Sequence, residues 1–555
     1  MTLLVRGDKA GNKDTTWVLA ALGVVLLLQL ELVWNRPVNW DEFFHLSEAH
    51  AFARGELHEL LQVFYARAFF WLARIGVDAV DQIRVARLFM LACELVTCCS
   101  IYAISRRFVN GTTALLATLS YVSAGYVLQH GMSFRADPMA AACLMGAMWI
   151  LLRSKPSLIA MTGAAILIGL GFTVTIKIVL YAPAFAAIAW LRWHDGSDRR
   201  ELLSNGIALL VLSVAFSGLF TWLGWLTLPE ALPPAAREAG RSLSSSGTMM
   251  FDLGLFPRGP YLIGAIFSAP LLALITIRTA IVLGRKSTAP ERDLRIAAWL
   301  LLATLGCVSF YANSFPYFYA FILPPVAVAG AIGLAAMQQS LDTRLLLAAM
   351  LVQAAISSFA TPREVLPAQK QMLVAVHEVF PEPVAYFDFP GMVPDYRKAN
   401  FFMTVWGVRK YRAGLEPTMA EVAREQVVPL LIVNQEPLVR NQGEPAGAWE
   451  LKPEDRILLK DGYIPHWGPL WVAGHAFAPA STAANFTVYT PGNYTLEGET
   501  ATIDGATVAN GAVIHLDRGS HALRHTSMRG VTLRWGDHLP RPRQPYSGVP
   551  VLKDF

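Results

Sequence analysis

Two adjacent carboxylates, Asp41 and Glu42, follow shortly after the first long apolar run of the chain, Trp17 to Trp34. A carboxylate at a membrane surface can act as a general base, because it can accept the proton of an attacking hydroxyl. The same pair is also typical of a helix start, as N-cap and first-turn acid, since the helix dipole favours negative charge there. The apolar pattern from Leu46 to Leu61 predicts a helix at this place, and the two interpretations are compatible.

Further charges stand at the edges of later apolar runs. Arg135 and Asp137 precede one such run, where they could complete the same pocket or serve only as an interfacial anchor and a helix cap before Pro138. Lys177 lies between two apolar runs, where a lysine is costly unless it faces a cavity or extends to the surface. Facing a cavity, its ammonium could bind a phosphate as a point charge.

The connection 229–259 is rich in Pro, Ser and Gly and carries Arg237 and Arg241. Its length suggests a loop over the membrane face. Its arginines could hold a lipid phosphate with two parallel hydrogen bonds, or they could simply lie in a solvated loop near headgroups.

His45 lies four residues after Asp41 and three before Glu48, so a helix would place all three on one face. This spacing permits a divalent metal site, although two carboxylates and one histidine on a helix also occur by chance. The chain contains no glycine-rich phosphate loop, no Ser/His/Asp elbow and no clustered CxxC motif. Nucleotide-driven chemistry and serine hydrolysis are therefore unsupported.

The elements that position these side chains are apolar stretches, and the composition of the chain indicates that these stretches lie in a membrane. The chain is 54% hydrophobic and 16% charged, against roughly 25% charged residues in ordinary soluble proteins. Apolar stretches of sufficient length predict a polytopic α-helical membrane protein with about eleven spans. The predicted spans are 17–34, 84–105, 112–129, 137–153, 158–175, 178–193, 204–228, 260–283, 296–313, 317–337 and 345–360.

The basic residues of the connections predict the orientation. Alternate connections carry clusters of lysine and arginine, which mark the cytoplasmic side. The clusters are Arg6, Lys9 and Lys13; Arg106 and Arg107; Arg153 and Lys155; Arg192, Arg199 and Arg200; Arg285, Lys286, Arg292 and Arg295; and Arg344. We therefore expect a multi-pass protein of the inner (plasma) membrane, with a cytoplasmic N-terminus and an extracytoplasmic C-terminal region.

From residue 361 the chain has the composition of a soluble protein. We expect three parts: a membrane domain over 1–360, an extracytoplasmic α/β domain over 361–480 and a small β-rich domain over 481–555. Short alternating strands in the last part predict a sandwich, which could be a packing module or could bind glycan through its aromatics. The net charge of +5 is spread along the chain without a basic stripe, so no nucleic acid partner is expected.

Four motifs in order resemble the polyprenyl-phosphate-dependent type C glycosyltransferases, in particular the protein O-mannosyltransferase-like and lipid A aminoarabinose transferase-like enzymes. They are Asp41-Glu42 after the first span, Arg135-Ala136-Asp137, the glycine-rich run Gly169-Leu170-Gly171 through Lys177 to Pro183, and Tyr317-Phe318-Tyr319 through Pro324-Pro325. The resemblance covers roughly residues 15–360 and departs from the family at His45, where an aromatic such as Tyr is usual.

The resemblance implies an inverting transfer of a sugar from a polyprenyl phosphate to an acceptor hydroxyl outside the cytoplasm. The acceptor would be a glycan, a lipid such as lipopolysaccharide, or a protein. Asp41 would be the base, with Glu42 and Asp137 as further acids, and Lys177 with Arg237 or Arg241 would hold the lipid phosphate. Arg135 and Tyr319 are further candidates for substrate binding, and His45 either contacts the substrate or merely packs. No cofactor is required, and a divalent metal stays open.

A transporter or lipid flippase is the alternative, since it would also have many spans and buried charges. Transporters tend to show repeated halves and sites near the middle of the membrane. No matching halves are evident here, and the acids lie at the edge of a span.

Overall fold

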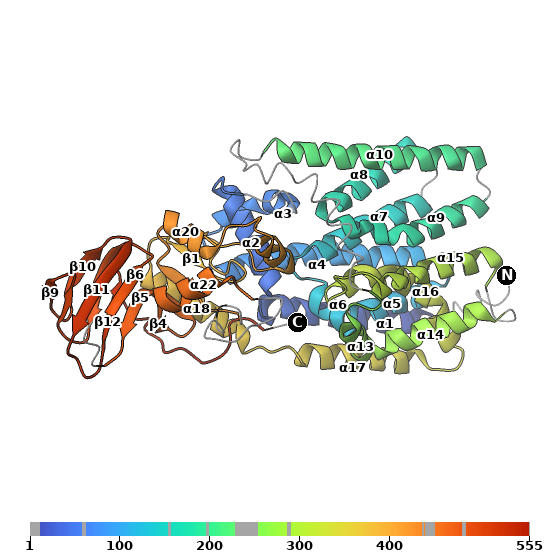
Figure 1. Ribbon diagram of the computed structural model, residues 1–555. Coiled ribbons are helices and arrows are strands. Elements are labelled where there is room, and N and C mark those ends of the chain that lie inside the picture. The colour runs from blue at the N-terminus through green and yellow to red at the C-terminus, as the bar shows by residue number, and fades with distance from the viewer. Residues whose placement is uncertain are drawn as a thin grey trace.

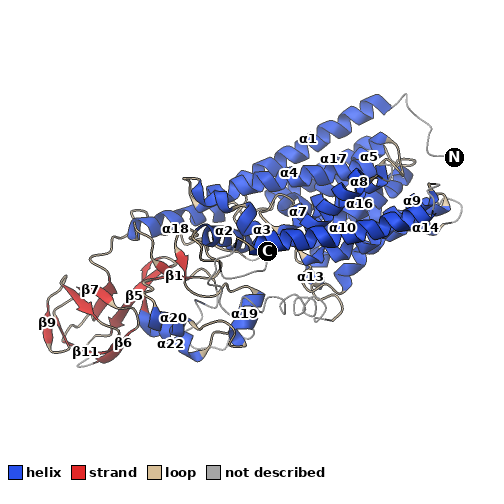
Figure 2. Cartoon of the chain, turned by 90° about the horizontal axis from the view of Figure 1, so that it is seen from above, coloured by secondary structure: helices blue, strands red, loops and turns tan. Residues whose placement is uncertain are grey.

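The computed structural model describes residues 11–57, 63–153, 157–195, 199–227, 254–285, 290–435, 438, 450–479 and 484–553. It is elongated, with a helical body at one end and a region of strands at the other (Figure 1). Seen from above in Figure 2, the strands are again confined to one end, and α18 (Val365–Val379) lies between them and the body.

Helices make up the body. They are α1 (Gly11–Asn35), α2 (Trp40–Ala53), α3 (Val63–Ala68), η1 (Phe70–Arg74), α4 (Ala79–Ser105), α5 (Gly111–Val122), α6 (Gly125–His130), α7 (Ala136–Arg153), α8 (Leu158–Val174), η2 (Ile176–Tyr181), α9 (Ala182–His194), α10 (Arg199–Trp225), α13 (Gly259–Ser268), α14 (Pro270–Gly284), α15 (Arg292–Ala303), η3 (Thr304–Ser309), α16 (Phe318–Met337) and α17 (Thr343–Phe359).

Each of the eleven predicted spans corresponds to a helix or to a broken pair of helices, which confirms the multispan helical fold. In the described part of the chain, six helices are long and apolar enough to cross a membrane, and α13 with α14 forms a further pair bent by 96°. Helices α5, α8 and α17 are apolar but shorter. The total of about eleven spans therefore stays a prediction.

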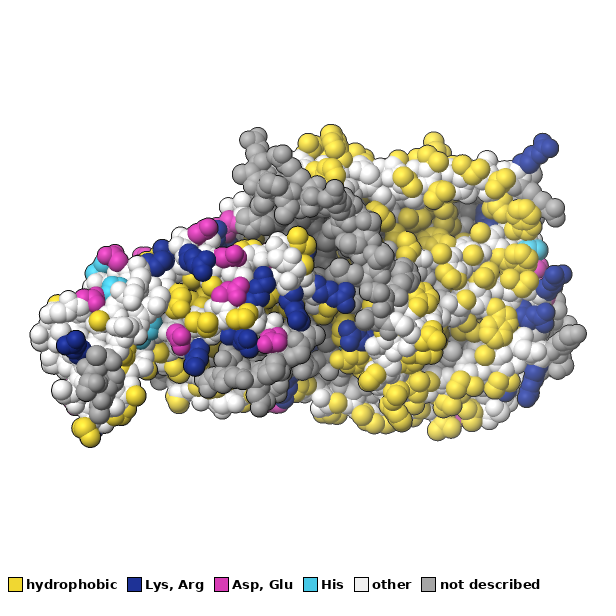
Figure 3. All heavy atoms as spheres, in the orientation of Figure 1, with side chains coloured by type: hydrophobic (Ala, Val, Ile, Leu, Met, Phe, Trp, Pro, Cys, Tyr) yellow, Lys and Arg dark blue, Asp and Glu magenta, His cyan; other side chains and the backbone are white. Residues whose placement is uncertain are grey.

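The surface of the body is apolar. Figure 3 shows hydrophobic side chains over most of the visible face of the body, whereas charged side chains gather over the strand region and at the far end of the body. Helix α10 has the most exposed apolar surface of these helices, since only 6% of its most apolar 18-residue stretch is buried. An apolar face of this extent fits contact with lipid, because its exposure to water would be energetically unfavourable.

The strand region begins with α18 and continues with the strands that follow it. It contains the strands β1 (Ala385–Phe387), β2 (Arg397–Lys398), β3 (Leu430–Ile432), β4 (Tyr463–Trp467), β5 (Leu470–Phe477), β6 (Ala484–Val488), β7 (Gly492–Glu497), β8 (Ala501–Ile503), β9 (Ala506–Val508), β10 (Val513–Leu516), β11 (Gly519–His525) and β12 (Val531–Trp535). Helices α19 (Val405–Arg412), α20 (Met419–Glu425) and α22 (Pro453–Gly462) accompany the first strands.

Two sheets form this region. The larger has the order β10-β7-β12-β5-β3-β1-β2, with β4 also on β5, and the smaller has the order β6-β11-β8-β9. The pairs β1–β2 and β1–β3 are parallel, and β3–β5 is antiparallel. Both sheets share a core that includes Leu496, Leu523 and Leu533, so the last part of the chain is a β-sandwich, as expected.

The larger sheet is continuous across residue 480, because β5 pairs with β12 from Val531↔Phe477 to Arg534↔Gly474. The α/β part and the sandwich therefore share one hydrogen-bonded sheet. The division into 1–360, 361–480 and 481–555 stays a prediction.

Candidate functional site

Helix α2 positions the two adjacent acids at the end of the body that faces the strand region. Asn39 is its N-cap: the Asn39 side chain accepts from the Asp41 amide at 3.0 Å, and the Glu42 carboxylate accepts from the Asn39 amide at 3.0 Å. This is a capping box, in which each partner satisfies an amide that the helix leaves unpaired. The helix-start interpretation is thus correct for the helix, although the cap is Asn39 and α2 ends at Ala53, short of Leu61.

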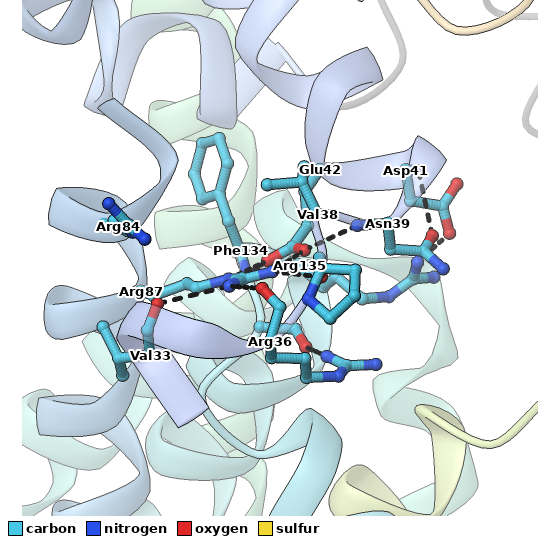
Figure 4. A network of polar contacts seen from close by, with 12 residues as sticks. Val33, Arg36, Val38, Asn39, Asp41, Glu42, Arg84, Arg87, Phe134 and Arg135 are labelled. Carbon is cyan, nitrogen blue, oxygen red and sulfur yellow. Dashed lines mark hydrogen bonds and ion pairs between the residues drawn. The ribbon is translucent and has the colours of Figure 1, made fainter. Parts of the chain in front are cut away.

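Glu42 is fully buried in a network of its own, which Figure 4 shows. Arg87 of α4 donates to both Glu42 oxygens, at 2.8 and 2.5 Å, and the Phe134 amide donates to Glu42 Oε1 at 2.9 Å. Arg87 also donates to the carbonyls of Arg36 and Pro37, both at 2.8 Å. Burial alone would raise the pKa of Glu42, but the Arg87 charge and these hydrogen bonds lower it to about 2. Glu42 therefore joins the start of α2 to α4 and to the segment before α7.

Asp41 leaves α2 in another direction, toward Arg135 (Figure 4). The Arg135 guanidinium is in ionic contact with Asp41, and its Nε lies 3.7 Å from the Asp137 carboxylate. Lys177 Nζ donates to Asp137 Oδ1 at 2.5 Å. Asp41, Arg135, Asp137 and Lys177 thus form a row of alternating charges, and all four are buried. We call these four residues the charge row.

The break between α8 and α9 brings Lys177 to this row. Thr175 caps the short helix η2 by accepting from the Lys177 amide at 3.4 Å, and η2 carries the lysine back toward α7. The polar break predicted between two spans is therefore the feature that lets Lys177 meet Asp137.

Aromatic side chains line the charge row. The Arg135 guanidinium lies 3.3 Å from the centroid of the Tyr317 ring, and Lys177 Nζ lies 5.7 Å from it. Cations bind aromatic faces electrostatically, so Tyr317 helps to hold both. The predicted residue Tyr319 is buried instead against Tyr126, with ring centroids 5.5 Å apart. Tyr317 belongs to the same Tyr-Phe-Tyr motif, and the motif alone did not distinguish the two tyrosines.

His45 lies one turn after Asp41 and is buried, with its ring 6.0 Å from that of Phe134. Burial lowers the pKa of His45 to about 4, so its imidazole is neutral at physiological pH. Within the described residues, no group of three or more His, Cys, Asp and Glu side chains gathers closely enough to hold a metal ion.

Arg237 and Arg241 lie in the segment 228–253, outside the described residues. The next arginine, Arg258, immediately precedes α13, where it donates to the Ala312 carbonyl at 3.2 Å and covers the Phe315 ring at 4.2 Å. Phe315 in turn lies 5.7 Å from Tyr317. An arginine from the end of this connection therefore approaches the aromatic wall of the charge row.

Sequence reasoning did not single out Arg87 or Arg36. Arg36 donates to the Ser133 hydroxyl at 2.8 Å and contacts His130 at 3.1 Å, and so ties α1 to the same segment before α7. The available signal was an arginine inside a predicted span, since Arg87 lies in 84–105. A charge in that position needs a partner, and Glu42 is that partner.

A comparison with known protein families gives a match to part of the chain. A family model described as dolichyl-phosphate-mannose-protein mannosyltransferase matches residues 67–225, which contain three of the four residues of the charge row. No curated protein matches the chain.

Several solved structures align with much of the chain. ArnT from Cupriavidus metallidurans bound to undecaprenyl phosphate is 16% identical, with a TM-score of 0.49 over 69% of this chain and 84% of that one. The Archaeoglobus fulgidus oligosaccharyltransferase in the apo form is 12% identical, with a TM-score of 0.46 over 91% and 76%. Arabinosyltransferase EmbB from Mycobacterium smegmatis is 12% identical, with a TM-score of 0.41 over 93% and 64%.

The apolar helices fit a multi-pass membrane protein, and over residues 67–225 the chain is similar to a mannosyltransferase family. The match confirms the resemblance to the polyprenyl-phosphate-dependent enzymes that the motifs predicted.

Proposed function

We propose that the protein transfers a sugar, with inversion, from a polyprenyl-phosphate donor to an acceptor hydroxyl on the extracytoplasmic side of the membrane. The observation that carries this proposal is the charge row. It places two acids and two cations together at the end of the helical body, next to aromatic faces. An acid for the acceptor proton and cations for the donor phosphate are the groups that such a transfer needs.

Asp41 is the proposed general base. Its carboxylate comes from α2 and is in ionic contact with Arg135 at one end of the charge row, and a carboxylate can accept the proton of an attacking hydroxyl. As the acceptor oxygen forms its bond to the anomeric carbon, its proton passes to Asp41. The bond from that carbon to the phosphate oxygen breaks at the same time, with its electron pair leaving on the phosphate. The products are the glycosylated acceptor and a polyprenyl phosphate monoester.

Lys177 and Arg135 are the proposed phosphate ligands. The leaving phosphate gains negative charge, so fixed cations stabilise it and no proton donor is required. Asp137 holds Lys177 at 2.5 Å and keeps the ammonium in place while the site is empty of donor. Arg237 or Arg241 is proposed to add a further contact to the phosphate.

Glu42, His45 and Tyr319 receive supporting roles. Both Glu42 oxygens already accept charge-assisted or amide hydrogen bonds, so Glu42 orients α2 and leaves the proton transfer to Asp41. Neutral His45 is proposed to contact the sugar next to Asp41. Tyr319 is proposed to support the aromatic side chains next to Tyr317.

The proposed location is the inner (plasma) membrane, with the N-terminus cytoplasmic. Basic residues on alternate connections support this orientation, and lysine and arginine side chains are visible at the end of the body away from the strands (Figure 3). The strand region and the charge row then face outward, where a glycan, lipid or protein acceptor is available. A transporter without glycosyl transfer is not favoured, because the family match is to a transferase.

The test is turnover by purified protein in lipid with polyprenyl-phosphate sugars, measured as release of free polyprenyl phosphate. We expect Asp41→Asn to lower kcat by roughly 10²- to 10⁴-fold, the usual contribution of a general base. Glu56→Gln is the matched control, since Glu56 lies in the same outer segment and pairs only with Arg54 in the described structure. Wild-type turnover in Asp41→Asn would remove Asp41 as the base, and no turnover by the wild type with any such donor would contradict the function.

A further inference from the structure

The amide side chain of Gln369, on α18 of the strand region, reaches the segment that precedes α2. Its Oε1 accepts from the Val38 amide at 2.9 Å, and its Nε2 donates to the Val38 carbonyl at 2.7 Å. The same Nε2 donates to the Val551 carbonyl at 3.0 Å. Gln369 is 0% exposed, so none of these bonds competes with water.

Val38 stands in a position where a small shift has consequences. It directly precedes Asn39, the N-cap of α2, and lies three residues before Asp41. On its membrane side, Arg87 holds the carbonyls of Arg36 and Pro37. Gln369 holds both backbone groups of Val38 itself. The short segment 36–39 is therefore fixed from two sides, by a residue of the body and by a residue of the strand region.

The strand region supports α2 at other points as well. The Trp40 and Phe389 rings are 5.5 Å apart, and the Phe44 and Phe402 rings are 4.6 Å apart. Gly391 has a φ of +79°, and a Cβ there would meet the Ser47 side chain at 2.7 Å, so this loop approaches α2 closely. These are packing contacts, whereas Gln369 alone among them bonds the backbone before Asp41.

The third bond of Gln369 ties in the end of the strand region. Residues 543–553 return along α18: the Arg543 amide donates to Glu378 at 3.0 Å, and Gln371 donates to the Pro545 carbonyl at 2.7 Å. Val551 is buried in the main core, next to Gln369. One amide thus binds two segments that lie 331 and 182 residues away from it in sequence.

We propose that Gln369 is a positioning residue for the transfer reaction: it sets the place of Asp41 by fixing Val38, and so makes the strand region part of the catalytic support. This inference rests on the proposed function. Only an amide suits the position, because Val38 presents both a donor and an acceptor. A carboxylate would face two carbonyl oxygens, and an apolar side chain would leave three buried polar groups without partners.

The experiment compares Gln369→Leu with Gln371→Leu in the full chain. The two glutamines are on the same helix and both bond the returning segment, but the described structure shows only Gln369 bonding Val38. We expect Gln369→Leu to lower kcat per folded protein roughly 10- to 100-fold with KM for the donor unchanged, because small misplacements of a catalytic group have effects of that size. Gln371→Leu is expected to keep kcat.

Hydrogen exchange of the amides of residues 36–42 gives a readout that needs no turnover. Exchange should speed up in Gln369→Leu and not in Gln371→Leu. If Gln369→Leu does not fold, Gln369→Asn, which keeps the amide but is one methylene shorter, replaces it with the same expectations. Wild-type kcat and wild-type exchange in the folded Gln369 variant would overturn the inference. Should Asp41→Asn keep full turnover while the exchange result holds, the proposed function fails and the fixing of Val38 stands.

Discussion

Two buried acid–lysine pairs, one in each region, differ in how fully their charges are satisfied. In the strand region, Asp388 pairs with Lys398 at 2.9 Å and also accepts from the amides of Gly391 and Met392 and from Asn434. In the helical body, Asp137 pairs with Lys177 at 2.5 Å and has Arg135 as its second charged neighbour at 3.7 Å. The first pair is surrounded by uncharged donors, and the second lies in a row of charges.

The difference separates a structural pair from a binding pair. Backbone and amide donors saturate the Asp388 carboxylate, so it has no remaining capacity for a ligand and serves to hold its loop. In the charge row, Asp137 and the Tyr317 ring lie between Arg135 and Lys177. A donor phosphate can therefore pair with these two cations in place of Asp137. Burial alone does not distinguish the two pairs, since all four side chains are almost inaccessible.

The largest effect on stability is expected from Lys398→Met. Removing one partner of a buried ion pair typically costs about 3–5 kcal/mol, because the other charge stays buried. Thermal unfolding of the purified protein should show a lower Tm, while turnover per folded molecule is retained. Loss of turnover without a change in Tm would contradict the structural role of this pair.

Low pH should remove the stabilisation that the ionised Glu42 side chain gives to the fold, and it should do so in a defined pH range. Its pKa is about 2 in the folded protein, below an ordinary value of 4.5. A difference of this size is worth about 3 kcal/mol, fully present above pH 4.5 and lost as the pH falls toward 2. We expect Tm to decline over that range in the wild type. Glu42→Gln should start from a lower Tm and decline less, and an equally steep decline in Glu42→Gln would show that other groups are responsible.

Lys177→Met tests the binding pair. Loss of one charge-assisted contact to the donor phosphate should raise KM for the polyprenyl-phosphate sugar roughly 10- to 100-fold. The Tm should fall less than in Lys398→Met, because Asp137 keeps Arg135 as a neighbour. Unchanged values of both KM and kcat with the donor would exclude Lys177 as a phosphate ligand and make the two pairs alike.

The smallest effect is expected from chelation. The proposed reaction uses Asp41, Arg135 and Lys177 and requires no cofactor, so EDTA should leave turnover unchanged. The control is EDTA with an excess of Mg²⁺ or Mn²⁺. A loss of turnover that either metal restores would place a divalent cation at the site and revise the role of the acids.

The sequence predicted the fold class and the order of its helices because apolar run length is a local property. From alternation and turns it also predicted strands at 486–489, 494–497, 501–503, 512–516 and 530–535, each of which overlaps a strand of the structure. It did not predict β9 and β11 or the continuity of the larger sheet across residue 480, because strand pairing joins segments far apart in sequence. Likewise, α2 begins at Trp40 because Asn39 is its N-cap. Asn39 and Asp41 can both cap a helix, and their spacing alone did not show which of them does.

The sequence by itself thus determined that the acids Asp41 and Glu42 stand at the end of a span, and that charges recur at 135, 137 and 177. Only the tertiary structure decided how the two acids differ: Arg87 donates hydrogen bonds to Glu42, whereas Arg135 links Asp41 to Asp137 and Lys177. Neighbouring residues on a helix point in different directions, and each carboxylate takes its properties from the partners that it meets there. Those partners come from other helices, so no window of sequence around Asp41 contains them.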